Sequence, residues 1–213
     1  MNREVYYESD SVIDLKEYKS MMNLIRKTPE NRLSKTSHIR KIYFNNDINY
    51  LEKDTKDKDV YSIVIVDGDR EHMMVELKSC RSGMILKDYA PIKEVECRNI
   101  FRGNIQWLQD SPYPLLKKLY LEIKINRRRI GVVVDYERQR FRLNHRKDFI
   151  EFDLSVKSVY GQYGDLLSDK LLMKERLDAG QVILAYKQSV YLPPVFTSVV
   201  KLTPPVEETV KQA

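Results

Sequence analysis

The sequence predicts an α+β fold in which antiparallel strands form a barrel or a sandwich and helices pack outside it. Several short segments alternate apolar and polar residues, as half-buried strands do. Apolar residues at helical spacing fill separate blocks before and between these strands. Because the strands and helices are segregated, the order argues against a parallel βαβ fold.

The first half of the chain begins with a short extended piece at 3–8. An amphipathic helix is expected over 10–27, where Ser9, Asp10 and Ser11 offer N-caps. Four strands should follow it, at 38–44, 61–66, 73–78 and 83–89. The tripeptide Asp67–Asp69 reads as a turn between the second and third of them, and the charged run 52–59 as an exposed loop.

The second half opens with a helical insertion at about 91–126. Gly103 interrupts this insertion, and Pro112 or Pro114 begins its last helix, which runs to about Lys124. Further strands are expected at 130–141, 149–152, 156–160 and 182–187, with a charged turn at 144–148 and a loop at 161–164. A final helix is predicted from Pro194. We therefore expect one domain over 1–202 and a C-terminal tail at 203–213.

Composition limits the protein class. Of 213 residues, 42% are hydrophobic and 32% charged, a balance that supports a folded core and argues against disorder. No apolar run approaches the roughly 18–20 residues that span a bilayer, and the first residues are too polar for a signal peptide. Cys80 and Cys97 suit free thiols in a reducing compartment, so a cytoplasmic location is expected.

The chain carries a net charge of +6, which suggests an anionic partner such as a nucleic acid, a phosphate polymer or an acidic membrane surface. No phosphate-binding glycine loop, dinucleotide fingerprint or nucleophile elbow occurs in the sequence. The three histidines, His38, His72 and His145, lie far apart in the sequence, and this spacing disfavours a zinc site.

Charged residues inside the predicted strands are the most informative feature. Residues two apart on a strand share a face, so Glu76 and Lys78 point the same way, as do Asp135 and Glu137. A charged side chain on a strand normally faces water. If these faces instead line the interior of a barrel, the charges need an anionic ligand, a metal ion or one another.

Several segments in matching order resemble one known family. The run from Gly131 to Phe141 resembles a valine-rich strand that ends in Asp/Glu-Tyr-x-Arg. Residues 181–187, with Leu192-Pro193 after them, resemble the pattern "VILEVK…LP". Residues 39–45 are similar to "IRSLYFD", 61–91 to "FRIR…LEKK…G…YK…AP", and 4–7 to "EIKY". Together they resemble the VTC domain of polyphosphate polymerases, in the triphosphate tunnel metalloenzyme superfamily, over about 2–200.

The resemblance implies an antiparallel tunnel in which basic side chains hold a polyphosphate chain or a nucleoside triphosphate. Acidic residues of such a tunnel hold Mn²⁺ or Mg²⁺ at the reacting phosphates. On this basis the expected phosphate-binding residues are Arg40, Lys78, Arg138 and Lys187, with Arg81 and Lys87 as weaker candidates. The expected metal ligands are Glu4, Glu76 and Glu137.

The sequence also departs from the family pattern at charged positions. Neutral residues stand where the family carries a basic residue or its metal-binding glutamate: Tyr6, Ser62, Val64, Phe149 and Ala185. Each loss removes a charge from the implied site, and one missing contact costs about 2–4 kcal/mol of transition-state stabilisation. The resemblance therefore implies impaired catalysis.

Three functions remain open at this point. The first is a catalytically impaired domain that binds polyphosphate or a nucleoside triphosphate, or that serves as a protein-assembly module. The second is an active, divalent-metal-dependent polyphosphate polymerase or triphosphatase. The third is a structural or interaction protein without a phosphate ligand, for which 127–129 and 138–147 offer surfaces for a protein or a nucleic acid.

Overall fold

The computed structural model describes residues 3–27, 32–44, 58–81, 84–143, 148–160 and 164–188. Some sequence-based predictions lie outside these residues. They are residues 52–57 of the loop predicted at 52–59, residues 144–147 of the turn predicted at 144–148, and residues 161–163 of the loop predicted at 161–164. The predicted helix from Pro194 and the tail at 203–213 also lie outside them.

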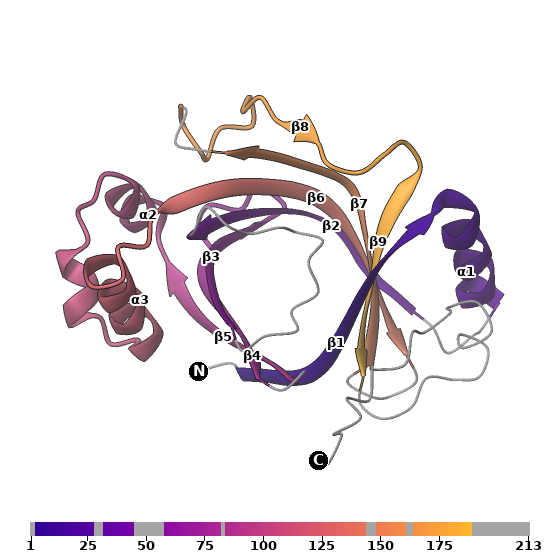
Figure 1. Cartoon of the computed structure of the whole chain (residues 1–213), viewed down its shortest axis with the longest axis horizontal. Coiled ribbons are helices and arrows are strands. Elements are labelled where there is room, and N and C mark those ends of the chain that lie inside the picture. The colour runs from indigo at the N-terminus through magenta and orange to yellow at the C-terminus, as the bar shows by residue number, and fades with distance from the viewer. Residues whose placement is uncertain are drawn as a thin grey trace, which may run out of the picture.

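A closed antiparallel barrel of eight strands forms the body of the protein (Figure 1). The strands are β1 (Arg3–Asp14), β2 (Arg32–Phe44), β3 (Lys58–Val66), β4 (Met73–Arg81), β5 (Met84–Ile92), β6 (Ile130–Leu143), β7 (Asp148–Tyr160) and β9 (Gln181–Gln188). Their order is β6-β2-β3-β4-β5-β1-β9-β7, and pairing of β6 with β7 closes the ring. The predicted α+β class with an antiparallel barrel is confirmed.

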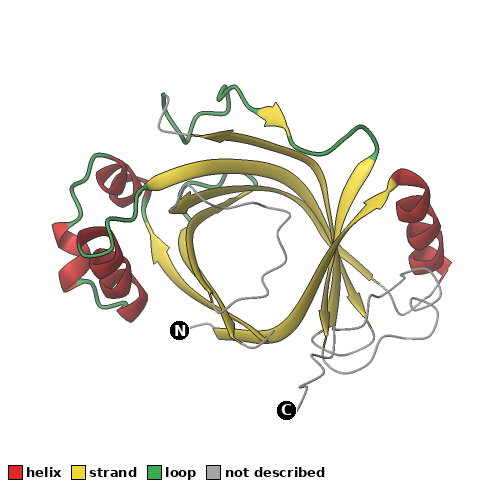
Figure 2. Cartoon of the chain, in the orientation of Figure 1, coloured by secondary structure: helices red, strands yellow, loops and turns green. Residues whose placement is uncertain are grey.

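The helices lie outside the barrel wall in two groups (Figure 2). They are α1 (Leu15–Lys27), α2 (Glu94–Phe101), the short 3-10 helix η1 (Gln106–Asp110) and α3 (Pro114–Lys124). The helical insertion predicted at about 91–126 is therefore present. Gly103 adopts φ 80° between α2 and η1, a conformation that favours glycine, and Pro114 occupies the first turn of α3.

The first strand is longer than the sequence predicted. The helix expected from residue 10 begins only at Leu15, because residues 7–14 pair with β9 in antiparallel register from Tyr7↔Gln188 to Asp14↔Gln181. Asp14 is the functional cap: its Oδ1 accepts a hydrogen bond from the Glu17 amide at 2.7 Å. The ladder with β9 thus prevails over the local capping signals at 9–11.

The two short strands expected at 149–152 and 156–160 are one strand, β7. Ser155 has φ 52° at an irregularity where the β6 register shifts between Asp135 and Glu137. Such a bulge bends the strand without ending it. A further two-residue strand, β8 (Lys174–Glu175), pairs with the outer edge of β7 and has no signal in the sequence.

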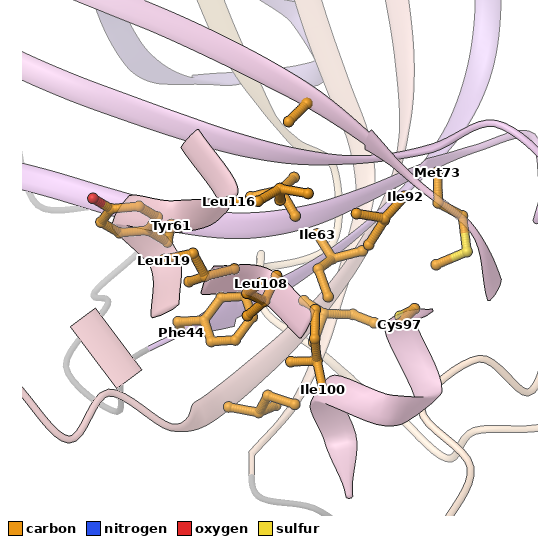
Figure 3. Close-up of a cluster of buried hydrophobic side chains, with 14 of the residues drawn as sticks. Phe44, Tyr61, Ile63, Met73, Ile92, Cys97, Ile100, Leu108, Leu116 and Leu119 are labelled. Carbon is orange, nitrogen blue, oxygen red and sulfur yellow. The ribbon is translucent and has the colours of Figure 1, made fainter. Parts of the chain in front are cut away.

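The larger hydrophobic core lies between α2, η1, α3 and the outer face of β2 to β5 (Figure 3). Phe44, Ile63 and Met73 are supplied by the strands, and Leu116 and Leu119 by α3. All five are at most 2% exposed. Because this core covers the outer face of these strands, their alternate residues point into the barrel.

A second outer core lies under α1. Met21 and Ile25 of this helix are each 1% exposed and pack with Phe152 and Leu184 of the neighbouring strands. Two smaller clusters belong to the inner wall, one around Tyr43 and Val134 and one around Tyr6 and Ile85. Both cysteines are buried free thiols, as expected. In the described residues, no helix has the length and hydropathy needed to cross a membrane.

The outer core gives a direct stability prediction. Replacing Leu119, which is fully buried, by alanine leaves a cavity between α3 and the barrel and should lower the free energy of unfolding by about 3 kcal/mol. Leu121 lies on the same helix and is 51% exposed, so Leu121→Ala should change it by less than about 0.5 kcal/mol. Urea unfolding of both variants tests this, and equal losses would contradict the packing described.

Candidate functional site

The strand register determines which side chains line the barrel interior. Lys41 pairs with Val64 and Val134, and Glu76 pairs with Ser62 and Tyr89, so these residues share the face opposite the helix-covered core. By the same register, the inner wall carries the basic residues Lys41, Lys78, Lys87, Arg138, Arg140 and Lys187. It also carries the acidic residues Glu4, Glu8, Asp10, Glu76, Glu151 and Asp153.

Two ion pairs on the inner wall connect β2 with β4 and β4 with β1. Lys41 Nζ lies 2.5 Å from Glu76 Oε1, and Lys78 Nζ lies 2.9 Å from Glu8 Oε2. Burial alone would raise the pKa of Glu76, but Lys41 and Lys87 outweigh this and lower it. Burial likewise opposes ionisation of Glu8, yet Lys87 and Lys78 lower its pKa to about 2. Both carboxylates are therefore ionised at neutral pH.

Arg138 is held by two acidic residues of β7. Its Nε and Nη2 donate to the two oxygens of Asp153 at 2.6 and 2.7 Å, and its Nη1 lies 2.8 Å from Glu151 Oε2. Arg140 Nη2 lies 2.5 Å from the other oxygen of Glu151. Bidentate pairing of this kind fixes the guanidinium plane as well as neutralising its charge.

Lys87 differs from the other basic residues of the inner wall. It is 6% exposed, and in the described part of the chain no carboxylate lies within salt-bridge distance of it. Its Nζ lies 5.4 Å from the centre of the Tyr6 ring, and Lys187 Nζ lies 4.0 Å from the same ring. Lys187 also pairs with Glu4 at 3.2 Å. Burial would lower the pKa of Lys87, but Glu76 and Glu8 raise it, so the ammonium stays charged.

Two hydroxyl groups of the inner wall, one of them on Tyr6 beside these lysines, lack hydrogen-bond partners. The Tyr6 hydroxyl and the Ser62 hydroxyl are both buried without one among the described contacts. An unsatisfied buried hydroxyl costs free energy unless water or a ligand supplies the missing bond. Around Tyr6, the barrel interior therefore combines the unneutralised Lys87 ammonium with a hydroxyl group that has no hydrogen-bond partner.

Asp10 is the acidic counterpart of Lys87. Its side chain is on the inner wall but is exposed to water, and in the described residues it forms no ion pair. Burial and the neighbouring Glu8 raise its pKa to about 7. Its carboxyl group therefore changes charge near neutral pH, unlike the carboxylates held by lysine or arginine.

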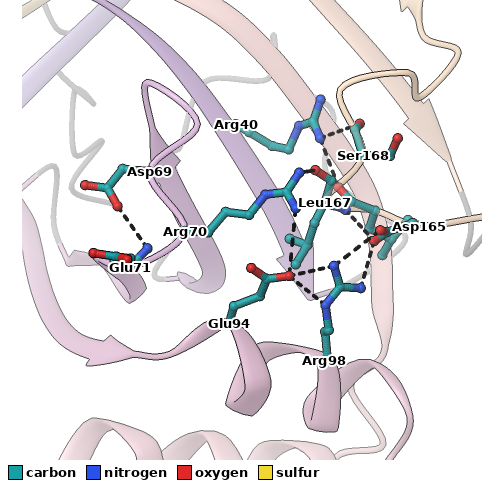
Figure 4. A network of polar contacts seen from close by, with 10 residues as sticks. Arg40, Asp69, Arg70, Glu71, Glu94, Arg98, Asp165, Leu167 and Ser168 are labelled. Atoms are coloured by element: carbon teal, nitrogen blue, oxygen red, sulfur yellow. Dashed lines mark hydrogen bonds and ion pairs between the residues drawn. The ribbon is translucent and has the colours of Figure 1, made fainter.

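The prediction that Arg40 joins the other three cations is wrong. Arg40 lies on the outer face, where its Nε and Nη2 pair with Asp135 at 2.8 and 2.7 Å. Its Nη1 donates to the carbonyl oxygens of Leu166 and Ser168 at 3.2 and 2.9 Å (Figure 4). Arg40 thus fastens the segment before β8 to the barrel wall. Lys78, Arg138 and Lys187 do share the inner face. Of the weaker candidates, Lys87 points inward, and Arg81 pairs with Asp59 on the other face.

The three expected metal ligands do not come together. Glu4 and Glu76 are on the inner wall and pair with lysines, while Glu137 is exposed on the outer face. Among the described residues, no group of three or more His, Cys, Asp or Glu side chains is arranged to hold a metal ion. Within the described residues, the three predicted ligands therefore form no common site for Mn²⁺ or Mg²⁺.

The neutral positions noted in the sequence fall on the inner wall. Ser62 and Val64 share the face of Lys41, and Tyr6 contacts both Lys87 and Lys187. Ala185 lies directly between Asp10 on β1 and Glu151 on β7. The charges that the resemblance leads one to expect are thus missing from the tunnel itself.

Sequence reasoning missed several inner residues. Lys41 was overlooked in favour of its neighbour Arg40, and Arg140 in favour of Arg138. A usable signal existed in β1, where Glu4, Glu8 and Asp10 fall on one face with Tyr6 at period two. The helix expected from residue 10 concealed this pattern.

The comparisons with known proteins identify the fold. No protein-family model and no curated protein matches the sequence. A Bacillus halodurans protein proposed to be an adenylate cyclase matches with a TM-score of 0.53 and 12% identity, over 89% of this chain and 83% of that one. A Hippeastrum protein proposed to be an adenylyl cyclase, with a dominant triphosphatase activity, matches with a TM-score of 0.47 and 11% identity. The match covers 92% of this chain and 82% of that one. The chain has the closed antiparallel barrel of the triphosphate tunnel, or CYTH-like, fold.

The position of Asp10 predicts a pH dependence of stability. Because its pKa rises from 3.8 to about 7 on folding, the proton stabilises the folded state at low pH, and this contribution is lost as pH rises through that range. Asp10→Asn should therefore be more stable than the parent at about pH 8, by about 1 kcal/mol since water screens the site. The difference should disappear near pH 4. Thermal unfolding across this range checks it, and a difference independent of pH would contradict it.

Proposed function

We propose that the protein is a divergent, VTC-like tunnel protein of impaired catalysis that binds polyphosphate or a nucleoside triphosphate inside the barrel. One observation carries this proposal: basic side chains from five strands, β2, β4, β5, β6 and β9, face a common interior. A linear polyanion needs several cations along one path, and residues of separate strands supply such a path.

Lys87 and Tyr6 suit the first contact with the anion. Lys87 keeps its charge without a carboxylate at salt-bridge distance, and the Tyr6 hydroxyl is available as a donor. Phosphate oxygens accept hydrogen bonds from both kinds of group. Binding there satisfies a buried hydroxyl and neutralises a buried cation, so both changes favour the complex.

The other inner cations must exchange partners when an anion binds. Lys78 would leave Glu8, and Arg138 would leave Asp153, at the cost of exposing a carboxylate to the phosphate charge. Protonation of acidic groups lowers this cost. Asp10 lies beside Glu8 and titrates near neutral pH, so affinity is expected to increase as the pH falls from about 8 to 6.

The impaired catalysis in this proposal is supported by the missing groups. Phosphoryl transfer depends on positioned charges at the reacting phosphates. Ser62, Val64 and Ala185 place neutral side chains on the wall, and the described acidic residues form no metal centre. Binding requires fewer of these charges than turnover does.

A second function, a structural or protein-assembly module without a phosphate ligand, is favoured by the balance of charges. In the described residues, five basic side chains of the inner wall already have a carboxylate partner: Lys41, Lys78, Arg138, Arg140 and Lys187. Buried ion pairs of this kind can have a purely structural role in the barrel, without any ligand. Direct binding measurements distinguish the two functions.

The binding function predicts that Lys87→Met weakens the affinity for tripolyphosphate by about tenfold or more, since a charged hydrogen bond is lost. Lys78→Ala combined with Arg138→Ala should weaken it further. Lys157→Met, which removes an exposed lysine paired with Glu175 outside the barrel, is the matched control and should have no effect. Isothermal titration calorimetry with tripolyphosphate, long-chain polyphosphate and ATP provides the measurement.

The catalytic part is tested separately by incubating the protein with ATP and Mn²⁺ or Mg²⁺. We expect neither polyphosphate synthesis nor phosphate release above background. Robust divalent-dependent turnover would refute the impairment and favour an active polymerase or triphosphatase. If the parent protein bound none of the three phosphate compounds, the structural function would stand instead.

A further inference from the structure

The solvent face of α3 exposes large apolar side chains. Leu121 is 51% exposed and Ile125, which follows the last turn, is 70% exposed. The opposite face of the helix packs Leu115, Leu116 and Leu119 into the outer core. The apolar residues of α3 thus lie on two faces, and only one of them is used by the fold.

Lysines surround the exposed apolar pair. At about 100° per residue, Lys117, Lys118 and Lys124 fall on the same third of the helix surface as Leu121 and Ile125, and all three are exposed. The amphipathic pattern of α3 therefore has a second, cationic and apolar stripe facing solvent.

The one acidic residue within α3 is paired with neighbouring groups. Glu122, the acidic residue of α3, lies at the border of the stripe, and its Oε2 is occupied by Arg128 and by the side-chain amide of Asn126. Arg128 also stacks over Tyr61, 5.3 Å from the ring centre, and so turns toward the barrel. Its neighbours Arg127 and Arg129 are exposed and extend the basic surface beyond the helix.

The stripe faces away from the barrel. Helices α2 and α3 lie together on one flank of the molecule, outside the strands (Figure 1). A partner that lies against α3 on this flank therefore does not have to enter the tunnel.

We propose that this face of α3 docks onto an anionic lipid surface. An interfacial helix has exposed leucine or isoleucine that enters the acyl boundary, with lysines that reach the headgroup phosphates. Clustered basic residues are attracted to anionic lipid. A nucleic acid offers phosphates but no apolar layer for Leu121 and Ile125, so the pairing of both features favours the membrane.

Helix α1 provides an internal comparison. Its solvent face also carries basic residues, including Lys16, Lys19 and Arg26, but Leu15 at its start is the only exposed large apolar side chain of α1. Positive charge alone is therefore common to both helices. Unlike α1, helix α3 has a pair of exposed apolar side chains among its basic residues. Variants of α1 therefore test whether positive charge alone is enough for vesicle binding.

The test is sedimentation of the whole chain with vesicles of phosphatidylcholine alone and of phosphatidylcholine mixed with phosphatidylserine. Binding is expected only to the mixed vesicles and should weaken as salt is added. Lys117→Gln with Lys124→Gln should lower the partition coefficient by about 25-fold, from about fivefold for each lysine. Leu121→Gln with Ile125→Gln should lower it by about tenfold or more.

Two matched controls change equivalent side chains elsewhere. Lys16→Gln with Lys19→Gln removes the same charge from α1, and Val5→Gln with Leu172→Gln removes apolar side chains that are 54% and 91% exposed. Both controls should retain most of the binding. All changed positions are exposed, and circular dichroism with urea unfolding confirms that each variant is folded.

Three results would overturn the proposal. The first is that the parent protein sediments with neither kind of vesicle, and the second is that the controls lose as much binding as the α3 variants. The third is preferential binding to a DNA duplex that the lysine changes weaken and the Leu121 and Ile125 changes do not, which identifies a nucleic-acid surface instead.

Discussion

The closed barrel imposes one constraint on the whole protein: every second residue of each strand faces an interior shared by eight strands. Many of the charged residues placed there, such as Lys41, Glu76 and Glu151, are shielded from bulk solvent, and partners must offset their desolvation. The inner wall meets this requirement by placing lysines and arginines of some strands opposite aspartates and glutamates of others, as Lys41 with Glu76 and Arg138 with Asp153. The side chains that stabilise the barrel are therefore the same ones that the proposed function assigns to anion binding.

If the barrel does derive from a phosphate-binding tunnel, as proposed, these ion pairs explain how the fold stays intact after some of the site's charges are lost. Cations alone on the inner wall would repel one another, whereas the acidic residues here offset most of their charge. Lys87 and Asp10 are a basic and an acidic residue of the inner wall that have no ion-pair partner among the described residues. The charge of Lys87 lowers the pKa of Asp10, which opposes the effect of burial. The interior is thus a structural ion-pair network that retains one unneutralised lysine.

Much of the fold was predictable, because local signals and tertiary structure agree over most elements. Turn-forming residues at Asp67–Gly68 predict the turn there, and Pro114 predicts the start of α3. The alternation of apolar and polar residues predicts strands β3 and β4. The direction of Arg40 was not predictable. Both faces of β2 are covered, by helices outside and by the barrel inside, so apolar neighbours flank Arg40 and Lys41 alike. Only pairing partners distant in sequence decide which one points inward.

The divided pairing of β1 has a consequence for how the chain folds. Its first residues pair with β5 and its later ones with β9, so the N-terminal strand joins segments that are about 80 and 180 residues away in the sequence. During synthesis, the edge of β1 that pairs with β9 has no native neighbour until almost the entire described chain has left the ribosome. An unpaired edge is a site for association with other chains. Closure of the ring is therefore a late, high-contact-order event, and premature termination before residue 181 leaves an open sheet.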